Sequence, residues 1–585
     1  MSILAGVVTR YKGVQLIDAL CESIKRTISR FPDDKVIEYR DSRALLTKID
    51  IGAYNSPGFL VGKTGSVSML AGEPLLNINN EENIHTRWSD LQILQRYWDE
   101  EKWDIGAATC GVFCAVHYEP AKGRISLITD RLGIRPLYYW IGEQYIVFAT
   151  ALRILEEIPI IPKCMDLRAV TEIASFGFPL SNRTPYWNIF VLKAAEIVQI
   201  DEKGVYKRQY WRWDQLQQLN LSESDLLTEA YTRFVKAVKR RLRTDKTTVA
   251  FLSGGLDSRC VVSILRDKNV TVHTFNFALP RTQDHVFAAE FAKKVKTIHT
   301  HVPINPGSCD VPGYAKTLSY AWSTSKYRNA YPPERPRLVW SGEGGSVAIG
   351  HVYLNREMCK LLQSGKDDLA IDMYLNKQYI GVPLKLFSPN IVHRIAMIPK
   401  QGIVEELNDI HCEDRCRGFH LFLMLNDQRR HLSNHFEGID LHRTEFHLPF
   451  FDGHLLELIL ASPIDLFLEH RFYHKWLYCF PSAVTAVPWQ TYPGHAKCPL
   501  PIPNNLAYQW GKESTHTQRR RNRSLVHETV SWLRADDFSH KIIRKERLWL
   551  ATLLTWMGLR DYGYVMKKAR IFYKYWKRCN GNYIL

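Results

Sequence analysis

The chain has 585 residues, of which 45% are hydrophobic and 23% are charged. This is the balance of a folded globular protein, and at about 100–200 residues per domain the length suggests two to four domains. A mainly disordered chain is excluded, because the apolar residues suffice for several buried cores. No apolar run reaches the roughly 18 residues of a membrane-spanning helix, so no membrane span is expected.

The twelve cysteines are sparse and form no Cys-x-x-Cys pair. A zinc site needs four converging ligands, and the closest pairs, Cys110/Cys114 and Cys412/Cys416, have no matching partners. We therefore expect free thiols and a cytoplasmic location. The apolar N-terminus, Met1–Val8, lacks a basic start, which favours a first strand over a signal peptide.

Positive charge is concentrated in the last part of the chain. The net charge is +17, and residues 511–585 hold 17 Lys or Arg against 6 Asp or Glu, an excess of 11. The densest run is Arg519–Arg523. Such a tail is typical of contact with an acidic surface, which can be nucleic acid, acidic lipid or an acidic protein. A solvated cationic helix surface is the alternative.

Three regions differ in pattern along the chain. Residues 1–205 alternate short β-like runs with helical stretches, such as 16–30, and predict a layered α+β domain. Residues 206–510 begin with an amphipathic helix over 222–243 and predict a second domain. Residues 511–585 have the pattern of a helical, aromatic extension.

The second domain contains a strand, a helix and a strand in close succession. The strands are Val249–Leu252 and Val272–Phe277, and the helix between them is Arg259–Arg266. This βαβ spacing implies a parallel sheet. A third strand, Arg337–Trp340, leads into a glycine-rich turn.

The strongest local signal is the turn Ser253–Ser258, which reads Ser-Gly-Gly-Leu-Asp-Ser between the first strand and its helix. Its two glycines let a ligand approach the main chain, and the amides at the helix N-terminus attract anions. Asp257 suits an anion site if a cation bridges it to the anion, which points to Mg²⁺ between Asp257 and polyphosphate oxygens. An ordinary strand–helix turn capped by serine is the alternative.

This turn resembles the pyrophosphate loop of the N-type ATP pyrophosphatases, which split ATP into AMP and pyrophosphate while adenylating a substrate. No Lys follows its glycines, so it is not a GxxxxGK[ST] loop. With a second turn at Ser341–Ser346, and with Glu445–Asp452 followed by Lys475–Leu477, the chain resembles asparagine synthetase and its relatives.

The N-terminal region resembles the class II glutamine amidotransferase domain of the same family. The matching segments are Thr129–Tyr139, Phe148–Thr150 and the pair Gly72 and Glu73. The resemblance covers about residues 1–500. It implies an N-terminal nucleophile-type αββα domain, followed by a parallel-sheet ATP pyrophosphatase domain with the helical extension behind it.

Several residues at the expected glutamine site depart from the family pattern. The resemblance places the nucleophilic Cys directly after Met1, where this chain has Ser2, a much weaker acid than a thiol. The Asn of the Asn-Gly-Glu element is Ala71, ahead of Gly72 and Glu73, and the Asp of a later element is Cys110. These changes predict a degenerate glutaminase site, and hence a structural remnant that does not release ammonia from glutamine.

The resemblance implies ATP and Mg²⁺ as cofactors of the second domain, with Asp257 as the metal ligand. The expected nucleotide contacts are Leu252, Ser253, Gly254, Gly255, Asp257, Ser258, Phe277 and Gly342. The expected catalytic residues are Asp257, Glu343 and Lys497, of which Lys497 is the nearest counterpart of a late family lysine, with a surface lysine as the alternative. An Asp and a Glu of the second turn are replaced by Ser346 and Val347, which should weaken Mg²⁺ binding.

The family chemistry has two steps. A substrate carboxylate attacks the α-phosphorus of ATP to give an acyl-adenylate and pyrophosphate, and an amine nitrogen then displaces AMP. One hypothesis is an asparagine synthetase-type ligase in amino-acid biosynthesis that uses free ammonia or a separate ammonia-donor subunit. Another is a ligase or cyclase acting on a different small-molecule or peptide carboxylate, like β-lactam synthetase and the lasso-peptide cyclases. The third is a binding protein without activity. A homodimer is one possible assembly, but the sequence does not determine the oligomeric state.

Overall fold

The computed structural model describes residues 2–54, 56–78, 86–303, 338–508, 515–535, 538 and 541–584, with side chains except for Ser2 and residues 515–521. The chain divides into two compact units. Unit 1 consists of Met1–Ile158, Leu192–Arg356 and Phe419–Gly511, and unit 2 of Pro159–Val191, Glu357–Gly418 and Lys512–Leu585.

Two antiparallel sheets form the N-terminal part of unit 1. One places β8 (Tyr138–Ile141), β9 (Tyr145–Ala149), β1 (Ser2–Thr9), β3 (Ala44–Asp50) and β2 (Val36–Arg40) side by side. The other has the order β13 (Val205–Gln209), β12 (Glu196–Ile200), β7 (Arg124–Thr129), β6 (Phe113–Glu119), β5 (Val67–Gly72) and β4 (Phe59–Val61).

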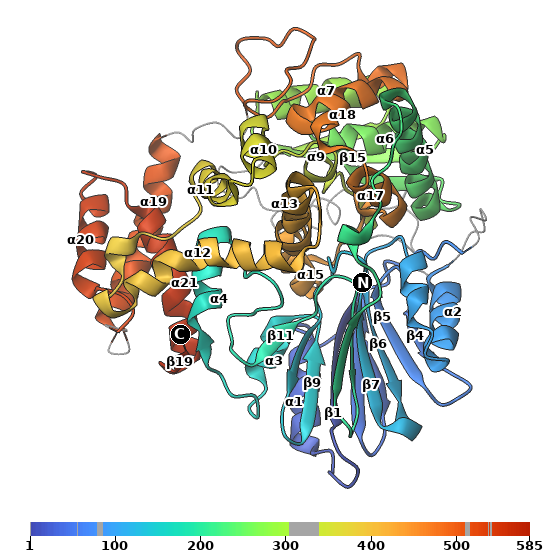
Figure 1. Ribbon diagram of the computed structural model, residues 1–585, viewed down its shortest axis with the longest axis vertical. Coiled ribbons are helices and arrows are strands. Elements are labelled where there is room, and N and C mark those ends of the chain that lie inside the picture. Colours follow the sequence, from blue (N-terminus) through green and yellow to red (C-terminus); the bar gives the residue numbers. More distant parts are fainter. Residues whose placement is uncertain are drawn as a thin grey trace. The chain divides into compact units, whose positions relative to one another are not determined.

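The sheets lie face to face, with α1 (Asp18–Ile28) against the first and α2 (Arg87–Asp99) against the second (Figure 1). Because both faces are covered, β6 is buried at every position and its sequence is a nearly continuous apolar run. Leu70, Leu94, Trp98 and Phe113 belong to the core under α2. The predicted αββα layering is confirmed.

A parallel sheet forms the second part of unit 1. Its order is β16 (Ile298–Pro303), β15 (Thr271–Ala278), β14 (Thr247–Phe251), β17 (Leu338–Trp340) and β18 (Glu445–His447). The predicted βαβ unit is present, with α6 (Asp257–Asp267) between β14 and β15, and all neighbouring pairs are parallel. Arg337, the predicted start of β17, lies outside the described residues.

The strand order reverses at β14, because β15 lies on one side of it and β17 on the other. Such a switch point opens a crevice at the carboxyl ends of the strands. The predicted amphipathic helix is α5 (Glu223–Leu242), capped by Ser222, and it buries Leu226, Phe234 and Ala237 along one face. Further helices of this region are α7 (Gln283–Val295), α9 (Gly345–Ala348), α14 (Arg429–His431), α15 (Ser433–Glu437), α16 (Ile439–His442), α17 (Gly453–Leu460) and α18 (Arg471–Trp476).

Unit 2 is mainly helical. The last part of the chain supplies α19 (Thr515–Arg534), α20 (Lys545–Trp556) and α21 (Gly563–Arg578), which pack against one another. They share the unit with α4 (Leu167–Phe176), α11 (Asp367–Lys377) and α12 (Pro389–Asp409), and β19 (Tyr583–Ile584) pairs with β10 (Met165–Asp166). Helices α10 (Arg356–Gln363) and α13 (Arg415–Leu423) span the unit boundaries along the chain.

The helical character predicted for the extension is confirmed, although it folds together with two earlier segments of the chain. None of the helices in the described ranges has both the length and the apolar character needed to cross a membrane.

Candidate functional site

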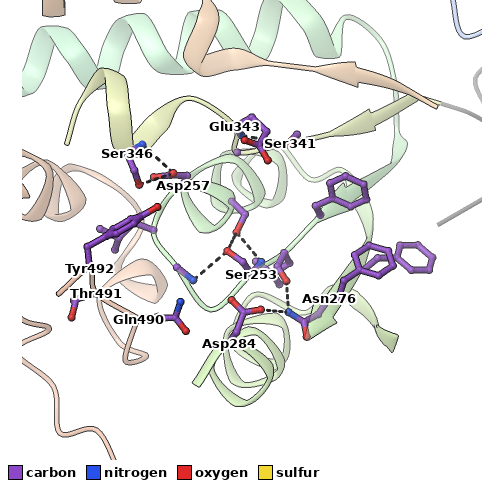
Figure 2. A pocket seen from close by; sticks show the side chains of 18 of the residues that line it. Ser253, Asp257, Asn276, Asp284, Ser341, Glu343, Ser346, Gln490, Thr491 and Tyr492 are labelled. Carbon is purple, nitrogen blue, oxygen red and sulfur yellow. Dashed lines mark hydrogen bonds between the residues drawn. The ribbon is translucent and has the colours of Figure 1, made fainter. Parts of the chain in front are cut away.

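A cavity of about 270 Å³ opens where the carboxyl ends of β14, β15 and β17 meet (Figure 2). It is called the main cavity below. Its lining residues are Phe251, Leu252, Ser253, Gly255, Leu256, Asp257, Ser258, Phe275, Asn276, Phe277, Asp284, Ser341, Gly342, Glu343, Ser346, His470, Gln490, Thr491, Tyr492 and Tyr508. Both predicted turns therefore face one cavity, as the switch point requires.

The two turns touch each other closely. Asp257 Oδ2 accepts hydrogen bonds from the Ser346 main-chain N–H at 3.0 Å and from the Ser346 hydroxyl at 2.9 Å. Gly342 comes so near the start of α6 that a Cβ at this position would lie 2.5 Å from the Ser258 nitrogen. Only glycine allows this approach, so the second turn is fixed against the N-terminus of α6.

Asp257 has a third donor, the Tyr473 hydroxyl, at 2.5 Å from Oδ1. Burial raises the pKa of Asp257 to about 6, although the donors from Tyr473 and Ser346 act to lower it. A carboxylate has about four acceptor positions, so three donors leave about one for a ligand. Ser346, predicted as the loss of a carboxylate, is thus a hydrogen-bond donor to the carboxylate that remains.

The first turn is held by its own side chains. The Ser258 hydroxyl accepts from the Ser253 N–H at 2.9 Å and lies 3.0 Å from the Ser253 hydroxyl, which accepts from the Gly255 N–H at 3.2 Å. Gly254 is occupied on the other side of the turn, where its N–H donates to Asp284 Oδ1 at 2.8 Å. A ligand bound at this turn would take the place of the hydrogen bonds that the Ser253 and Ser258 hydroxyls now make within it.

Gly254 is placed differently from the other predicted nucleotide contacts. It was expected to offer its amide to the nucleotide, but that amide is bonded to Asp284 and Gly254 is not among the lining residues. A Cβ at Gly254 would lie 2.6 Å from the Asp284 Cα, so the glycine is needed for packing. The other predicted contacts, from Leu252 to Gly342, do line the cavity.

Glu343 forms an ion pair at the cavity. Its Oε2 lies 2.9 Å from His431 Nε2, on α14. Burial alone would lower the pKa of His431, but the Glu343 carboxylate raises it to about 9. Burial would raise the pKa of Glu343, and His431 lowers it below its usual value. Glu343 is therefore a charged group with a partner rather than a free base.

One wall of the cavity is aromatic. Phe251, Phe275 and Phe277 line it, and the rings of Phe251 and Phe277 meet edge to face at 5.5 Å. Beside this wall, the Asn276 amide donates to Asp284 Oδ2 at 3.1 Å. A planar base can stack on such a wall while the amide and carboxylate fix polar atoms.

A second group of predicted residues, Ala71, Gly72, Glu73 and Cys110, is called the Glu73 site. Ala71 and Gly72 end β5, and both Glu73 and Cys110 are buried. The Ser2 side chain lies outside the described ones. Glu73 forms an ion pair with Arg243 at 2.6 Å.

The neighbourhood of Glu73 is closed. Arg135 and Glu445, both almost fully buried, form a second ion pair at 2.6 Å. Both belong to the lining of the adjoining cavity, whose volume is about 10 Å³. That volume holds about one water molecule.

Comparisons with known proteins match two regions of the chain. A model of the asparagine synthase family matches residues 229–322, and one of the glutamine amidotransferase domain matches residues 76–211. Over these ranges the chain is similar to the asparagine synthetase family.

Individual relatives cover the chain in part. A putative glutamine-hydrolysing asparagine synthetase of Methanocaldococcus jannaschii is 28% identical over 235 residues, which are 39% of this chain and 45% of that protein. A glutamine-hydrolysing asparagine synthetase of Bacillus subtilis is 22% identical over 325 residues, 50% of this chain and 43% of that protein. The chain thus spans less than half the length of the curated relatives it matches. A solved structure of glutamine phosphoribosylpyrophosphate amidotransferase from B. subtilis covers 48% of this chain and 66% of that chain, at 9% identity and a TM-score of 0.24.

The lysine expected from the asparagine synthetase family has no place at the main cavity. Lys497 is exposed and is not among the lining residues. The segment that does reach the cavity is Gln490–Tyr492, shown with its side chains in Figure 2. Sequence matching missed it because the local pattern contains neither a glycine turn nor a charged residue, and it also missed His470 and Tyr508.

The ionisable side chains that line the main cavity are mainly acidic. The lining contains Asp257, Asp284 and Glu343, and none of its members in the described ranges is Lys or Arg. A triphosphate would depend on the amides at the start of α6 and on a metal ion for its counter-charge.

The residues present fit Mg²⁺ that arrives with phosphate oxygens. Mg²⁺ commonly keeps several waters and binds one or two carboxylates together with substrate phosphates. Asp257 has about one acceptor position left for such an ion. In the described part of the chain no group of three His, Cys, Asp or Glu side chains could hold a metal ion by itself.

Proposed function

We propose that the protein is an ATP-dependent amide ligase that activates a carboxylate as its adenylate and then joins it to an amine nitrogen. The observation that carries this is the meeting of the two turns at Asp257, which puts a carboxylate at the N-terminus of α6 on the wall of the main cavity. A purely structural turn would not need a carboxylate there beside an open cavity.

The geometry supports the following roles. The first amides of α6, with the Ser253 and Ser258 hydroxyls, would bind the departing pyrophosphate, because these helix amides lack partners within the helix. Asp257 would hold Mg²⁺, which neutralises the developing phosphate charge when bound. The aromatic wall around Phe277 would bind the adenine base.

We also propose that this ligase does not obtain ammonia from glutamine in its own N-terminal domain. The support is the Glu73 site, where the Glu73 carboxylate is paired with Arg243 and the adjoining cavity measures about 10 Å³. The amine then comes from solution, from another subunit or from the substrate itself. Purified protein should release no glutamate from glutamine, and turnover that disappears in Ser2→Ala would contradict this.

ATP–pyrophosphate exchange tests the adenylation step. We expect exchange with a suitable carboxylate, and its loss in Asp257→Asn, which keeps the side-chain shape and removes the charge. Asp267→Asn is the matched control, because Asp267 ends the same helix and lies outside the main cavity. Equal exchange and equal nucleotide binding in both variants would contradict the proposed function.

The acidic lining favours one substrate class within this reaction. Asp257 and Asp284, whose hydrogen-bond donors are neutral groups, would repel a dicarboxylate such as aspartate more than a substrate with one carboxylate and one amine, whose net charge is zero. A substrate whose own amine attacks the adenylate is therefore the second candidate. Exchange that occurs without aspartate and with an amine-bearing carboxylate favours it, whereas exchange that requires aspartate favours the asparagine synthetase-type reaction.

A further inference from the structure

An exposed apolar surface lies on α20 and on the turn that follows it, in unit 2. It is called the α20 patch and consists of Leu550, Leu553, Trp556, Met557 and Leu559, which expose between 46% and 70% of their surface. Single exposed apolar residues are common, but a contiguous group of large ones marks an interaction surface.

Helix α20 has two apolar sides. Leu548 and Ala551 are buried, and the helix packs against α19 and α21, beside which Figure 1 shows it. Leu550, Leu553 and Met557 are spaced three and four residues apart, so they share a different side of the helix. The exposed side is therefore not needed for the packing of the helix within its unit.

Basic residues outnumber acidic ones in the sequence around the patch. Residues 541–578 hold 11 Lys or Arg and 2 Asp or Glu. Arg547 lies one turn before Leu550, and Arg560 directly follows Leu559, and both are exposed. Lys567, on the following helix, is exposed as well. A partner must thus offer negative charge and an apolar phase at the same surface.

We propose that the α20 patch docks on an anionic lipid surface, with Trp556 and Leu559 entering the headgroup region and the flanking arginines contacting lipid phosphates. Large apolar side chains exposed on one side of a helix, with basic residues near them, can lie in the plane of a membrane interface. At 12 residues, or about 18 Å, α20 is far too short to span the bilayer.

The composition of the patch favours lipid over nucleic acid. A phosphate backbone would pair with Arg547 and Arg560, but it would leave the aliphatic side chains of Leu550 and Met557 in water. Protein surfaces that bind single-stranded nucleic acid stack several bases on aromatic rings, whereas four of the five residues of this patch are aliphatic or Met and Trp556 is its aromatic residue. Lipid headgroups and acyl chains satisfy both kinds of side chain.

Co-sedimentation of the full chain with vesicles tests the proposal. We expect binding to vesicles that contain phosphatidylglycerol, much weaker binding to phosphatidylcholine alone, and a decrease with salt. The double variant Trp556→Ser with Leu559→Ser should weaken binding by about tenfold or more. Arg547→Gln with Arg560→Gln should weaken it severalfold, and only for the anionic vesicles.

Trp187→Ser provides the matched control. Trp187 is 59% exposed and also lies in unit 2, but it is distant in sequence from the patch. It should leave vesicle binding unchanged, and circular dichroism of all variants should match that of the unchanged chain. Failure of the full chain to bind anionic vesicles would overturn the proposal, as would equal binding by the Trp556/Leu559 variant. Binding to RNA in place of vesicles would also overturn it and assign the cations to a nucleic acid.

Discussion

The Glu73 site and the main cavity are both built around carboxylates, but the partners of these carboxylates differ. At the Glu73 site the partners are guanidinium groups of Arg243 and, for Glu445, of Arg135. At the main cavity Asp257 is held by the hydroxyls of Ser346 and Tyr473. The first arrangement pairs each carboxylate with a cation of the protein. The second leaves acceptor capacity on Asp257 beside a volume of about 270 Å³.

This difference separates a site closed by its own ion pairs from one that can take a ligand. A buried ion pair with good geometry leaves no charge for a substrate to neutralise, and breaking it costs several kcal/mol. Neutral donors such as hydroxyls can rotate toward a ligand at a much smaller cost.

Removing one partner of the closed site should destabilise unit 1 strongly. Arg135→Met leaves the Glu445 carboxylate buried without its partner, and we expect a loss of about 3–5 kcal/mol in the free energy of unfolding. Urea denaturation followed by tryptophan fluorescence measures it. The double variant with Glu445→Met should recover much of the loss, because the remaining charge is removed.

A surface ion pair is the control for this effect. Lys475 and Glu223 pair at 2.6 Å but are exposed by 51% and 35% of their side chains. Lys475→Met should cost less than about 1 kcal/mol. Equal losses for Arg135→Met and Lys475→Met would mean that the buried pair does not hold the Glu73 site closed.

At the main cavity the two glycines of the first turn should respond differently to the same change. Gly254→Ala places a Cβ 2.6 Å from the Asp284 Cα, so the main chain must shift, at about 1–3 kcal/mol and with loss of nucleotide binding. Gly255→Ala meets the Ser253 hydroxyl at 3.4 Å, an ordinary contact, and should keep most of both. Thermal unfolding and calorimetric titration with ATP and Mg²⁺ compare them, and identical behaviour of the two variants would contradict the geometry.

A substitution at Ser346 should change the affinity of the main cavity for Mg²⁺. Ser346→Asp adds a carboxylate next to Asp257. Without Mg²⁺ the two carboxylates repel each other, whereas with Mg²⁺ the new carboxylate gives the ion a second protein ligand. We expect the Mg²⁺ concentration for half-maximal ATP binding to fall severalfold. Ser346→Asn, of similar shape and without charge, should not lower it, and an equal effect of both variants would show that charge is not the cause.

Much of the fold could be predicted because local patterns determine it. The spacing of apolar residues predicts the strand before Ser253, the helix after it and the amphipathic helix α5. The structure has these elements at nearly the predicted positions. The turns at Ser253–Ser258 and Ser341–Ser346 were found for the same reason. Their position in one cavity follows from parallel strands ending at one sheet edge.

The remainder of the site depends on contacts across the sequence that no local pattern reveals. Tyr473 reaches Asp257 across 216 positions, and His431 reaches Glu343 across 88. Lys497 was placed by matching a loop of uncertain register, and the structure brings Gln490–Tyr492 to the cavity instead. The joining of the tail with residues 159–191 and 357–418 in unit 2 is equally a property of long-range packing.

The smallest predicted effect is a pH dependence at the edge of the main cavity. The Glu343 carboxylate raises the pKa of His431 to about 9, above its unfolded value of about 6.5. A histidine with a raised pKa contributes its full stabilisation below about pH 6.5 and loses it as the pH rises through about 9. Because the His431 side chain is 42% exposed, solvent screens the pair and the effect on stability should be small.

His431→Gln should therefore reduce the decline in melting temperature between about pH 6.5 and 9 only slightly. The same variant should change the pH dependence of nucleotide binding more clearly, since Glu343 lines the cavity. If the unchanged chain and His431→Gln have the same pH profiles for both quantities, the ion pair with Glu343 does not form in solution.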